Sequence, residues 1–301
     1  MSGVVYLSPS RALTWEACKR QYWYQYILRW KPSFESATLL YGSAIHLAIE
    51  MWLRGLVLGH NVDAGAVFSK AYLDSVAGKR VQYTDDWDET SLIQCGLRSL
   101  AEFQKEWIER GYQPFIDLQG EPVLEREIAV DIGCGVILRM KMDCLALTPE
   151  ILIKVIDWKT PKQAAPEGFA LVADQTLAYQ LGVEAIGPEL GFTHIDGVGF
   201  VEIFKKKRGA SVSFDQETGR RPNGQVEEYV KKLQGYAEEI RSSNFYPRKA
   251  GQAFGSPCGL CNFRSHCHKG EYEGIDMESV QKSMESNRGR QLSLVPTVRA
   301  A

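Results

Sequence analysis

The sequence VILRMKMDCLALTPEILIKVIDWK, residues 136–159, contains two apolar runs separated by the turn residues Thr148-Pro149-Glu150. Such runs around a proline turn predict two antiparallel strands. Each run carries one acidic residue, Asp143 or Asp157, where a buried strand would favour an apolar side chain. Residues two apart in a strand share a face, so Asp157 and Lys159 project to the same side.

The pairing of these two strands decides how close the acidic residues come. If the hairpin pairs symmetrically about Pro149, Asp143 lies opposite Val155, one step along the strand from Asp157, and a small change of register would place it directly opposite. Two carboxylates and the Lys159 ammonium would then converge on one face of the sheet. This combination predicts a divalent-metal site with a cationic helper.

Composition sets the broad class of protein. The chain has 301 residues, of which 45% are hydrophobic and 24% charged, which is typical of a globular protein. The formal net charge is −2, so any basic nucleic-acid surface must be local. No apolar run reaches the roughly 20 residues of a membrane helix, and the N-terminus lacks a signal-peptide pattern. We therefore expect a cytoplasmic protein of a bacterial cell or a phage-infected host.

Periodicity and turn signals divide the chain into a helical part (1–118), a sheet core (119–205) and a C-terminal helix with a cysteine cluster (206–270). We treat 1–270 as one domain and expect a flexible tail over 271–301. Helices are predicted over 13–27, from Tyr41 onward, and over 62–76, 91–111, 168–186 and 223–241. Strands are predicted over 122–131, 136–147, 151–159 and 195–204.

Several polar residues outside the hairpin are candidates for the same site. Some of them lie two or four positions apart, which places both side chains on one face of a strand or helix. Others form a basic run that could contact phosphates. A lone histidine on an apolar helix is usually a core residue and a lysine run is usually solvated surface, but the nearby carboxylates favour a functional role. The candidates are His46, Gln175 with Tyr179, Glu125 with Glu127, and Lys205-Lys206-Lys207-Arg208.

The cysteines predict a second metal site. There are seven, an odd number without an export signal, which argues against a disulfide framework. Cys258, Cys261 and Cys267 lie within ten residues. Zinc could take these three with His266 or His268. An iron–sulfur cluster needs a fourth thiolate, commonly distant in sequence, and Cys18 is a suitable one.

In this combination of motifs the chain resembles the RecB-like branch of the PD-(D/E)xK nuclease superfamily, and within it the iron–sulfur nucleases. These include CRISPR-associated adaptation nucleases, AddB-type nuclease domains and phage exonucleases. Six motifs occur in the family's order. They are Ser8-Pro9-Ser10 with Cys18 and Tyr22, Gly42 to His46, Asp143, Asp157-Trp158-Lys159, Gln175 to Tyr179, and the terminal cysteine trio. The motif around Asp143 departs from the family pattern at Met142 and Met140, and the (D/E)xK acid is Asp rather than Glu.

The resemblance implies an α/β, restriction-endonuclease-like core with a central mixed β-sheet flanked by helices. It implies that Asp143, Asp157, His46 and the Trp158 carbonyl hold Mg²⁺ or Mn²⁺, while Lys159 assists hydrolysis. Gln175 and Tyr179 would position the DNA strand or the lysine. Glu125 and Glu127 match no motif of the family, and one of them is a candidate for a place behind the ligands. A [4Fe-4S] cluster on Cys18, Cys258, Cys261 and Cys267 would be structural, with zinc as the alternative.

We therefore expect a metal-dependent deoxyribonuclease, an exonuclease used in DNA recombination, repair or phage DNA processing. Its partners would be DNA, including single strands, and a helicase, recombinase or annealing protein. No Walker A motif occurs in the sequence, so unwinding would come from such a partner. Two other functions fit parts of the pattern: a nucleic-acid-binding module that does not cut, and a zinc-binding structural or interaction protein.

Overall fold

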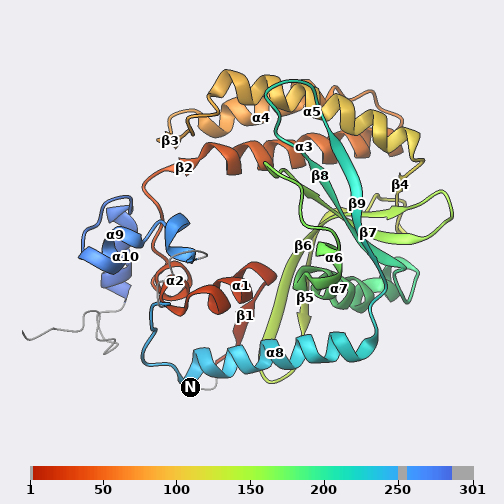
Figure 1. The fold of residues 1–301 in the computed structure, drawn as a ribbon. Coiled ribbons are helices and arrows are strands. Elements are labelled where there is room, and N and C mark those ends of the chain that lie inside the picture. Colours follow the sequence, from red (N-terminus) through yellow and green to blue (C-terminus); the bar gives the residue numbers. More distant parts are fainter. Residues whose placement is uncertain (1–2, 250–255, 287–301) are drawn as a thin grey trace, which may run out of the picture. The chain divides into compact units, whose positions relative to one another are not determined.

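The computed structural model describes residues 3–249 and 256–286 (Figure 1). The chain forms two compact units. The sheet unit comprises residues 3–9 and 35–235, and the cysteine unit comprises, within the described residues, 10–34, 236–249 and 256–286. The single domain expected over residues 1–270 stays a prediction. Within the described residues, every helix is too short or too polar to cross a membrane.

A mixed seven-stranded sheet forms the centre of the sheet unit. The strand order is β1-β6-β7-β8-β9, and β4 and β5 also pair with β6. The pairs β1–β6 and β7–β8 are parallel, and the others are antiparallel. The strands are β1 (Val5–Leu7), β4 (Gln113–Pro114), β5 (Leu124–Asp131), β6 (Val136–Leu147), β7 (Ile153–Lys159), β8 (Gly197–Ile203) and β9 (Val212–Gly219).

The β6–β7 hairpin has the predicted strands but not the symmetric register. The structure pairs Cys144 with Ile156, and the same register continued by one pair sets Asp143 opposite Asp157. The expected pairing of Asp143 with Val155 is therefore wrong. The reason is the turn, which closes by a hydrogen bond from Thr148 N to Leu152 O (3.0 Å). Its last residue, Ile151, is left-handed (φ 64°), as three-residue hairpin loops require.

Helices cover both sides of this sheet, which confirms the predicted fold class (Figure 1). On one side α3 (Ala37–Leu58), α4 (Ala64–Val76) and α5 (Glu89–Glu109) share a hydrophobic core with the strands. On the other side α7 (Asp174–Leu190) packs on β5, β6 and β8, and the short α6 (Phe169–Val172) lies against β8 and β9. Strands β2 (Glu35–Ser36) and β3 (Val81–Gln82) form a separate parallel pair.

The cysteine unit is helical and has an aromatic core. Trp15, Tyr22, Trp23, Tyr24 and Trp30 are buried in it together with Tyr246 and Phe263. Its elements are α1 (Pro9–Ala17), α2 (Lys19–Tyr22), the π-helical turn η1 (Trp23–Ile27), the 3₁₀ turn η2 (Pro257–Leu260), α9 (Arg264–Lys269) and α10 (Met277–Ser286). Helix α8 (Asn223–Ser242) begins in the sheet unit and ends in the cysteine unit.

Two predictions for this unit differ from the structure. The helix predicted over 13–27 is interrupted at Cys18, which is extended (φ −163°, ψ 109°) between α1 and α2. The tail predicted from residue 271 contains α10, because Val280 is buried there and the Lys31 N–H donates to Ser279 Oγ (3.0 Å). Residues 287–301 of that tail lie outside the described residues.

Candidate metal-dependent active site

His46 projects from α3 toward the end of β7. A side chain at Gly42, one turn earlier, would place its Cβ 3.2 Å from Thr160 Oγ1, so the glycine lets the helix approach the strand closely. His46 Nε2 lies 3.1 Å from the backbone oxygen of Trp158. The Gly-x-x-x-His spacing therefore has a physical basis here. The glycine allows α3 to lie close to the end of β7, and the histidine side chain then reaches the Trp158 carbonyl.

Asp143 holds the same backbone segment from the other strand of the hairpin. The Trp158 N–H donates to Asp143 Oδ2 (2.7 Å), and Asp143 Oδ1 lies 3.4 Å from His46 Nδ1. The Trp158 ring is buried against Phe103 and Trp107, with centroids 5.2 and 5.7 Å away. Packing of this ring thus fixes the backbone atoms that both polar residues contact.

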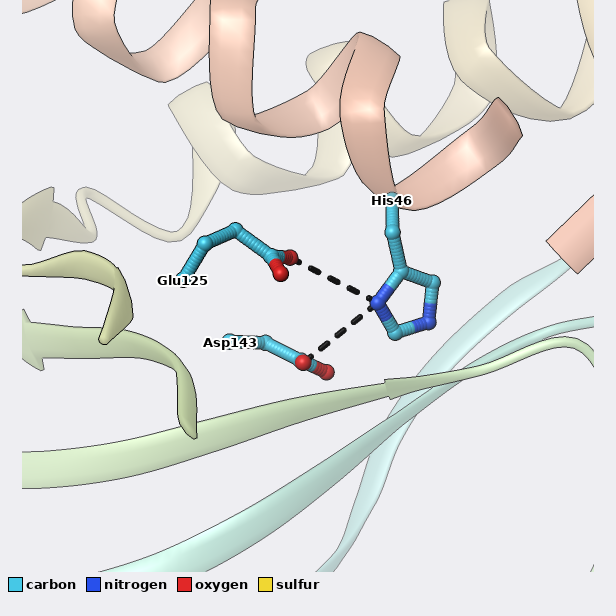
Figure 2. A group of neighbouring side chains, drawn as sticks. All are labelled: His46, Glu125 and Asp143. Atoms are coloured by element: carbon cyan, nitrogen blue, oxygen red, sulfur yellow. Dashed lines mark ion pairs between the residues drawn. The ribbon is translucent and has the colours of Figure 1, made fainter. Parts of the chain in front are cut away.

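Glu125 on β5 completes a group with His46 and Asp143 (Figure 2). Its Oε1 lies 3.6 Å from His46 Nδ1, and its Oε2 lies 2.5 Å from Lys141 Nζ. One potential ligand atom from each of the three residues lies within 4.8 Å of the others. Glu127 is exposed and pairs with Lys141 in the strand register, so it stands outside this group.

The conformation of Glu125 explains its place in the group. It has a φ of 50°, in the left-handed region, inside a strand that is otherwise extended. A non-glycine residue in that region costs about 1–3 kcal/mol, and such residues cluster at functional sites. The interruption breaks the simple alternation of faces along β5, so the sequence pattern alone did not distinguish Glu125 from Glu127.

Asp157 is nearly inaccessible, with 2% of its surface exposed, and is held by two elements. Its Oδ2 lies 2.5 Å from Lys159 Nζ on the same strand. From α7, Gln175 Nε2 donates to Asp157 Oδ1 (3.1 Å) and the Tyr179 hydroxyl donates to the same oxygen. Gln175 Nε2 also lies 2.8 Å from the Tyr179 hydroxyl. The structure thus brings the four predicted residues of the second strand and α7 into one network.

Burial and neighbouring charges shift the pKa values of the site's ionisable groups. Burial, followed by the charge of Asp157, raises the pKa of Asp143. Burial lowers the pKa of His46, but the nearby carboxylates of Asp143 and Glu125 outweigh it and bring that pKa to about 10. Burial opposes ionisation of Glu125, yet His46 and Lys141 together lower its pKa. Burial and then the charge of Asp157 raise the pKa of Tyr179, which keeps its hydroxyl protonated.

A divalent cation fits these residues. Glu125 Oε1 is a buried atom that accepts no hydrogen bond within the described residues, whereas the buried Asp157 Oδ2 has the Lys159 ammonium beside it. A buried carboxylate oxygen without a donor is costly. Hard oxygen ligands with one imidazole suit Mg²⁺ or Mn²⁺, and a dication would offset the repulsion between Asp143 and Asp157. Glu125 therefore joins the predicted ligands as a direct candidate.

The basic run lies just beyond β8 and divides into two kinds of residue. Lys205 is half-buried, its ammonium donates to Thr160 O, and burial lowers its pKa. Lys206, Lys207 and Arg208 are all exposed. Arg98 on α5 donates to the backbone oxygens of Lys206 and Lys207 (both 3.2 Å), which holds the run in place.

The four predicted cluster cysteines gather in the cysteine unit. Cys18 is buried, and Cys258, Cys261 and Cys267 are partly buried. Burial raises the pKa of the Cys261 thiol, and the charges of Cys18, Cys267 and Cys258 raise it further. The extended backbone at Cys18 is what separates its thiol from the helical pattern on either side.

The two histidines considered as zinc ligands have other neighbours. The His266 ring centroid lies 5.0 Å from that of Trp30 and 4.5 Å from that of Tyr272. His268 Nδ1 lies 3.5 Å from Arg248 Nη1. His266 Nδ1 is nevertheless buried without a hydrogen-bond partner among the described residues, so the four-thiol set and the zinc set with a histidine both stay predictions.

Comparison with known proteins bears on this geometry. Residues 6–268 match the family model described as the PD-(D/E)XK nuclease superfamily. A search of curated proteins finds no match. A solved structure described as "Crystal structure of SSO0001" is 14% identical, with a TM-score of 0.32, and the alignment covers 79% of this chain and 87% of that one. The match of the family model over most of the chain shows that the protein belongs to the PD-(D/E)XK nuclease superfamily.

Proposed function

We propose that this protein is a Mg²⁺- or Mn²⁺-dependent DNA exonuclease of the RecB-like, iron–sulfur branch of its superfamily. The superfamily supports a metal-dependent nuclease. The observation that carries the proposal is the group His46, Glu125 and Asp143, in which Glu125 Oε1 is buried without a donor, beside the buried Asp157–Lys159 pair. A module that only bound nucleic acid would gain nothing from such carboxylates beside phosphate.

The residues of the chain have distinct parts in this proposal. Asp143, Asp157, Glu125, His46 and the Trp158 carbonyl would hold the metal, which supplies a water of lowered pKa and neutralises phosphate charge. The Lys159 ammonium, beside Asp157 Oδ2, stabilises the negative charge that develops on the phosphate. Gln175 and Tyr179 fix the Asp157 carboxylate by donating to its other oxygen.

The exposed cations of the basic run are proposed to contact the DNA backbone. Lys206, Lys207 and Arg208 follow β8, the strand next to β7 in the sheet, which carries Asp157 and Lys159. With a net charge of −2 for the whole chain, attraction of DNA must come from local groups such as these. Lys205 differs, because it is half-buried and already donates to Thr160 O.

The cysteine unit is proposed to carry a [4Fe-4S] cluster rather than zinc. The resemblance to the iron–sulfur nucleases supports this choice, because a cluster takes four thiolates with one commonly distant in sequence. Cys18, Cys258, Cys261 and Cys267 fit that pattern, and the charges of the other three raise the pKa of the Cys261 thiol after burial does.

The setting of the activity is proposed on the same basis. DNA recombination, repair or phage DNA processing would supply the substrate, and a helicase, recombinase or annealing protein would present single strands. The cytoplasm of a bacterial cell or of a phage-infected host is the proposed location. Each of these follows from the RecB-like assignment.

The test is degradation of end-labelled single- and double-stranded DNA with Mg²⁺ or Mn²⁺, with and without a chelator. The wild-type protein should shorten labelled DNA from an end, and Lys159→Ala should lower kcat by a factor of at least about 100, because a preorganised charge beside the reacting phosphate is lost. Circular dichroism should show an unchanged fold in the variant.

Lys154→Ala is the matched control. Lys154 lies at the opposite end of β7 from Lys159 and pairs with the exposed Glu217 (2.6 Å). Loss of the Lys154 side chain should therefore leave kcat near the wild-type value. Full activity of purified Lys159→Ala would remove Lys159 from the proposed mechanism. Absence of metal-dependent cleavage by the wild-type protein would leave the non-cleaving DNA-binding module as the function.

A further inference from the structure

A cavity of about 360 Å³ opens beside Lys159 in the sheet unit. The cavity is lined by Lys159 of β7, Phe200 and Glu202 of β8, and Gln216 of β9. Phe169, the first residue of α6, also lines it. Its size is in the range of small-ligand sites, about 300–1,000 Å³. Because Lys159 borders both this cavity and Asp157, an occupant would lie next to the reacting phosphate.

The exposed ring of Phe169 makes the cavity suitable for a flat ligand. Phe200 is buried, with 2% of its surface exposed, whereas Phe169 is 39% exposed. Their centroids lie 5.6 Å apart at an interplanar angle of 42°. Lys159 Nζ lies 5.6 Å from the Phe200 centroid. Exposed aromatic faces next to cations are where the bases of single-stranded nucleic acids stack.

Two polar side chains that line the cavity, Glu202 and Gln216, present acceptor oxygens beside the donor Lys159. Glu202, 4% exposed, accepts one hydrogen bond, from Ala165 N to its Oε1 (2.8 Å). Gln216 Nε2 donates to the backbone oxygens of Ala165 (3.2 Å) and Pro166 (3.0 Å). Within the described residues, Glu202 Oε2 and the Gln216 carbonyl oxygen have no protein donor. A carboxylate oxygen that faces the cavity without a protein donor can accept a hydrogen bond from a ligand.

The strand geometry places these acceptors in the cavity. Phe200 pairs with Gln216, and the register of β8 with β9 then shifts between Phe200 and Glu202. Such irregularities re-aim side chains and are frequent beside active sites. Since the Glu202 and Gln216 contacts also hold the backbone of Ala165 and Pro166, the loop that closes the cavity is fixed by the same two side chains.

We propose that this cavity binds the nucleobase next to the scissile phosphate and prefers bases with an exocyclic amino group over thymine. The inference rests on the proposed nuclease function. Adenine, cytosine and guanine present an amino donor, whereas thymine presents none, and a glutamate accepting from such an amine is a known mode of base recognition. Stacking on the exposed ring of Phe169 holds the base, and the Glu202 carboxylate distinguishes its edge.

The test uses single-stranded oligo-dT substrates, and their duplexes, whose terminal nucleotides at both ends are dA, dC or dT. A fourth substrate carries deoxynebularine, which is deoxyadenosine without its 6-amino group. The wild-type protein should release dA and dC with a kcat/KM about fivefold or more above that for dT. Deoxynebularine should behave like dT, because it stacks as adenine does but offers no amino donor.

Glu202→Leu tests the acceptor directly. It should bring the ratio of the dA and dT rates close to one, because the side chain keeps a similar size but loses both oxygens. Glu217→Leu is the matched control, because Glu217 is exposed on β9 next to Gln216 and pairs with Lys154. That variant should keep the full preference.

The outcomes separate the inference from the function on which it rests. Equal wild-type rates on all four substrates would overturn the base preference while leaving the nuclease proposal intact. A preference that survives in Glu202→Leu would overturn the role of the carboxylate. No cleavage of any substrate would overturn the proposed function and the inference with it. The substrate comparison needs only the wild-type protein, so it decides the preference even if a variant fails to fold.

Discussion

Glu125 adopts a backbone conformation that extended strands do not use, and its carboxylate lies beside His46 as a result (Figure 2). The same residue pairs with Lys141 (2.5 Å) through its second oxygen. At this scale the candidate site is a balance of charges: the neighbouring cations offset the cost of burial at Glu125, whose pKa is lowered, but not at Asp143, whose pKa is raised. A divalent ion is the group that would complete the balance.

This arrangement predicts that Glu125→Gln weakens metal binding. The amide loses one negative charge and one strong oxygen ligand, so the Kd for Mn²⁺ should rise at least about tenfold. Titration calorimetry of the purified protein measures this directly. Glu127→Gln, two residues along the same strand and exposed, should bind Mn²⁺ like the wild type. Equal affinities in the two variants would place Glu125 outside the metal site.

At the scale of elements, the helical layer that carries His46 depends on close packing between α4 and α5. A Cβ at Gly96 on α5 would lie 2.2 Å from the ring of Phe68 on α4, which is fully buried. Gly235 on α8 is exposed, and a Cβ there would meet nothing within 4 Å. The two glycines are both helical, so they separate the effect of packing from that of helix propensity.

Gly96→Ala should therefore destabilise the protein although alanine favours helices. Overpacking of a full core costs about 1–3 kcal/mol, against a gain in helix propensity of at most about 1 kcal/mol. Gly235→Ala should gain about 0.5–1 kcal/mol, because only propensity changes there. Urea unfolding followed by circular dichroism measures both. A Gly96→Ala variant as stable as Gly235→Ala would contradict the tight contact between α4 and α5.

At the scale of the whole chain, the cysteine unit is built from segments near both ends of the sequence. Cys18 and Cys258 are separated by roughly 240 residues, and a shared metal centre would cross-link them. Closing so long a loop removes much of the entropy of the unfolded chain. The proposed cluster would thus stabilise the fold without taking part in cleavage.

Cys18→Ser should accordingly lose the iron and the visible absorption band of an iron–sulfur protein. It should also lower the free energy of unfolding by about 2–5 kcal/mol, as removal of a cross-link does. Cys134→Ser, at an exposed position in the β5–β6 turn, should change neither property. Unchanged iron content in Cys18→Ser would exclude it as the fourth ligand, and zinc without iron in anaerobically purified wild-type protein would replace the cluster.

Local patterns were enough to predict much of this protein from its sequence. The apolar run 136–147 became β6 with the predicted bounds, and the second run became β7 starting two residues late. Helix α8 differs from its prediction by one residue. These features depend on alternation, helical periodicity and turn residues, which act over a few neighbouring positions. Strands β1 and β9 were not predicted; β1 is only three residues long.

Only the tertiary structure decided which side chains meet. The left-handed Ile151 set the register that brings Asp143 opposite Asp157, and the left-handed Glu125 selected one glutamate of an equivalent-looking pair. The extended Cys18 broke a helix that its neighbours favour. The sequence by itself thus determined the strands and the order of the motifs. Single backbone conformations in a hairpin loop, a strand and a helix break determined the geometry of the site, because alternation and helical periodicity do not specify them.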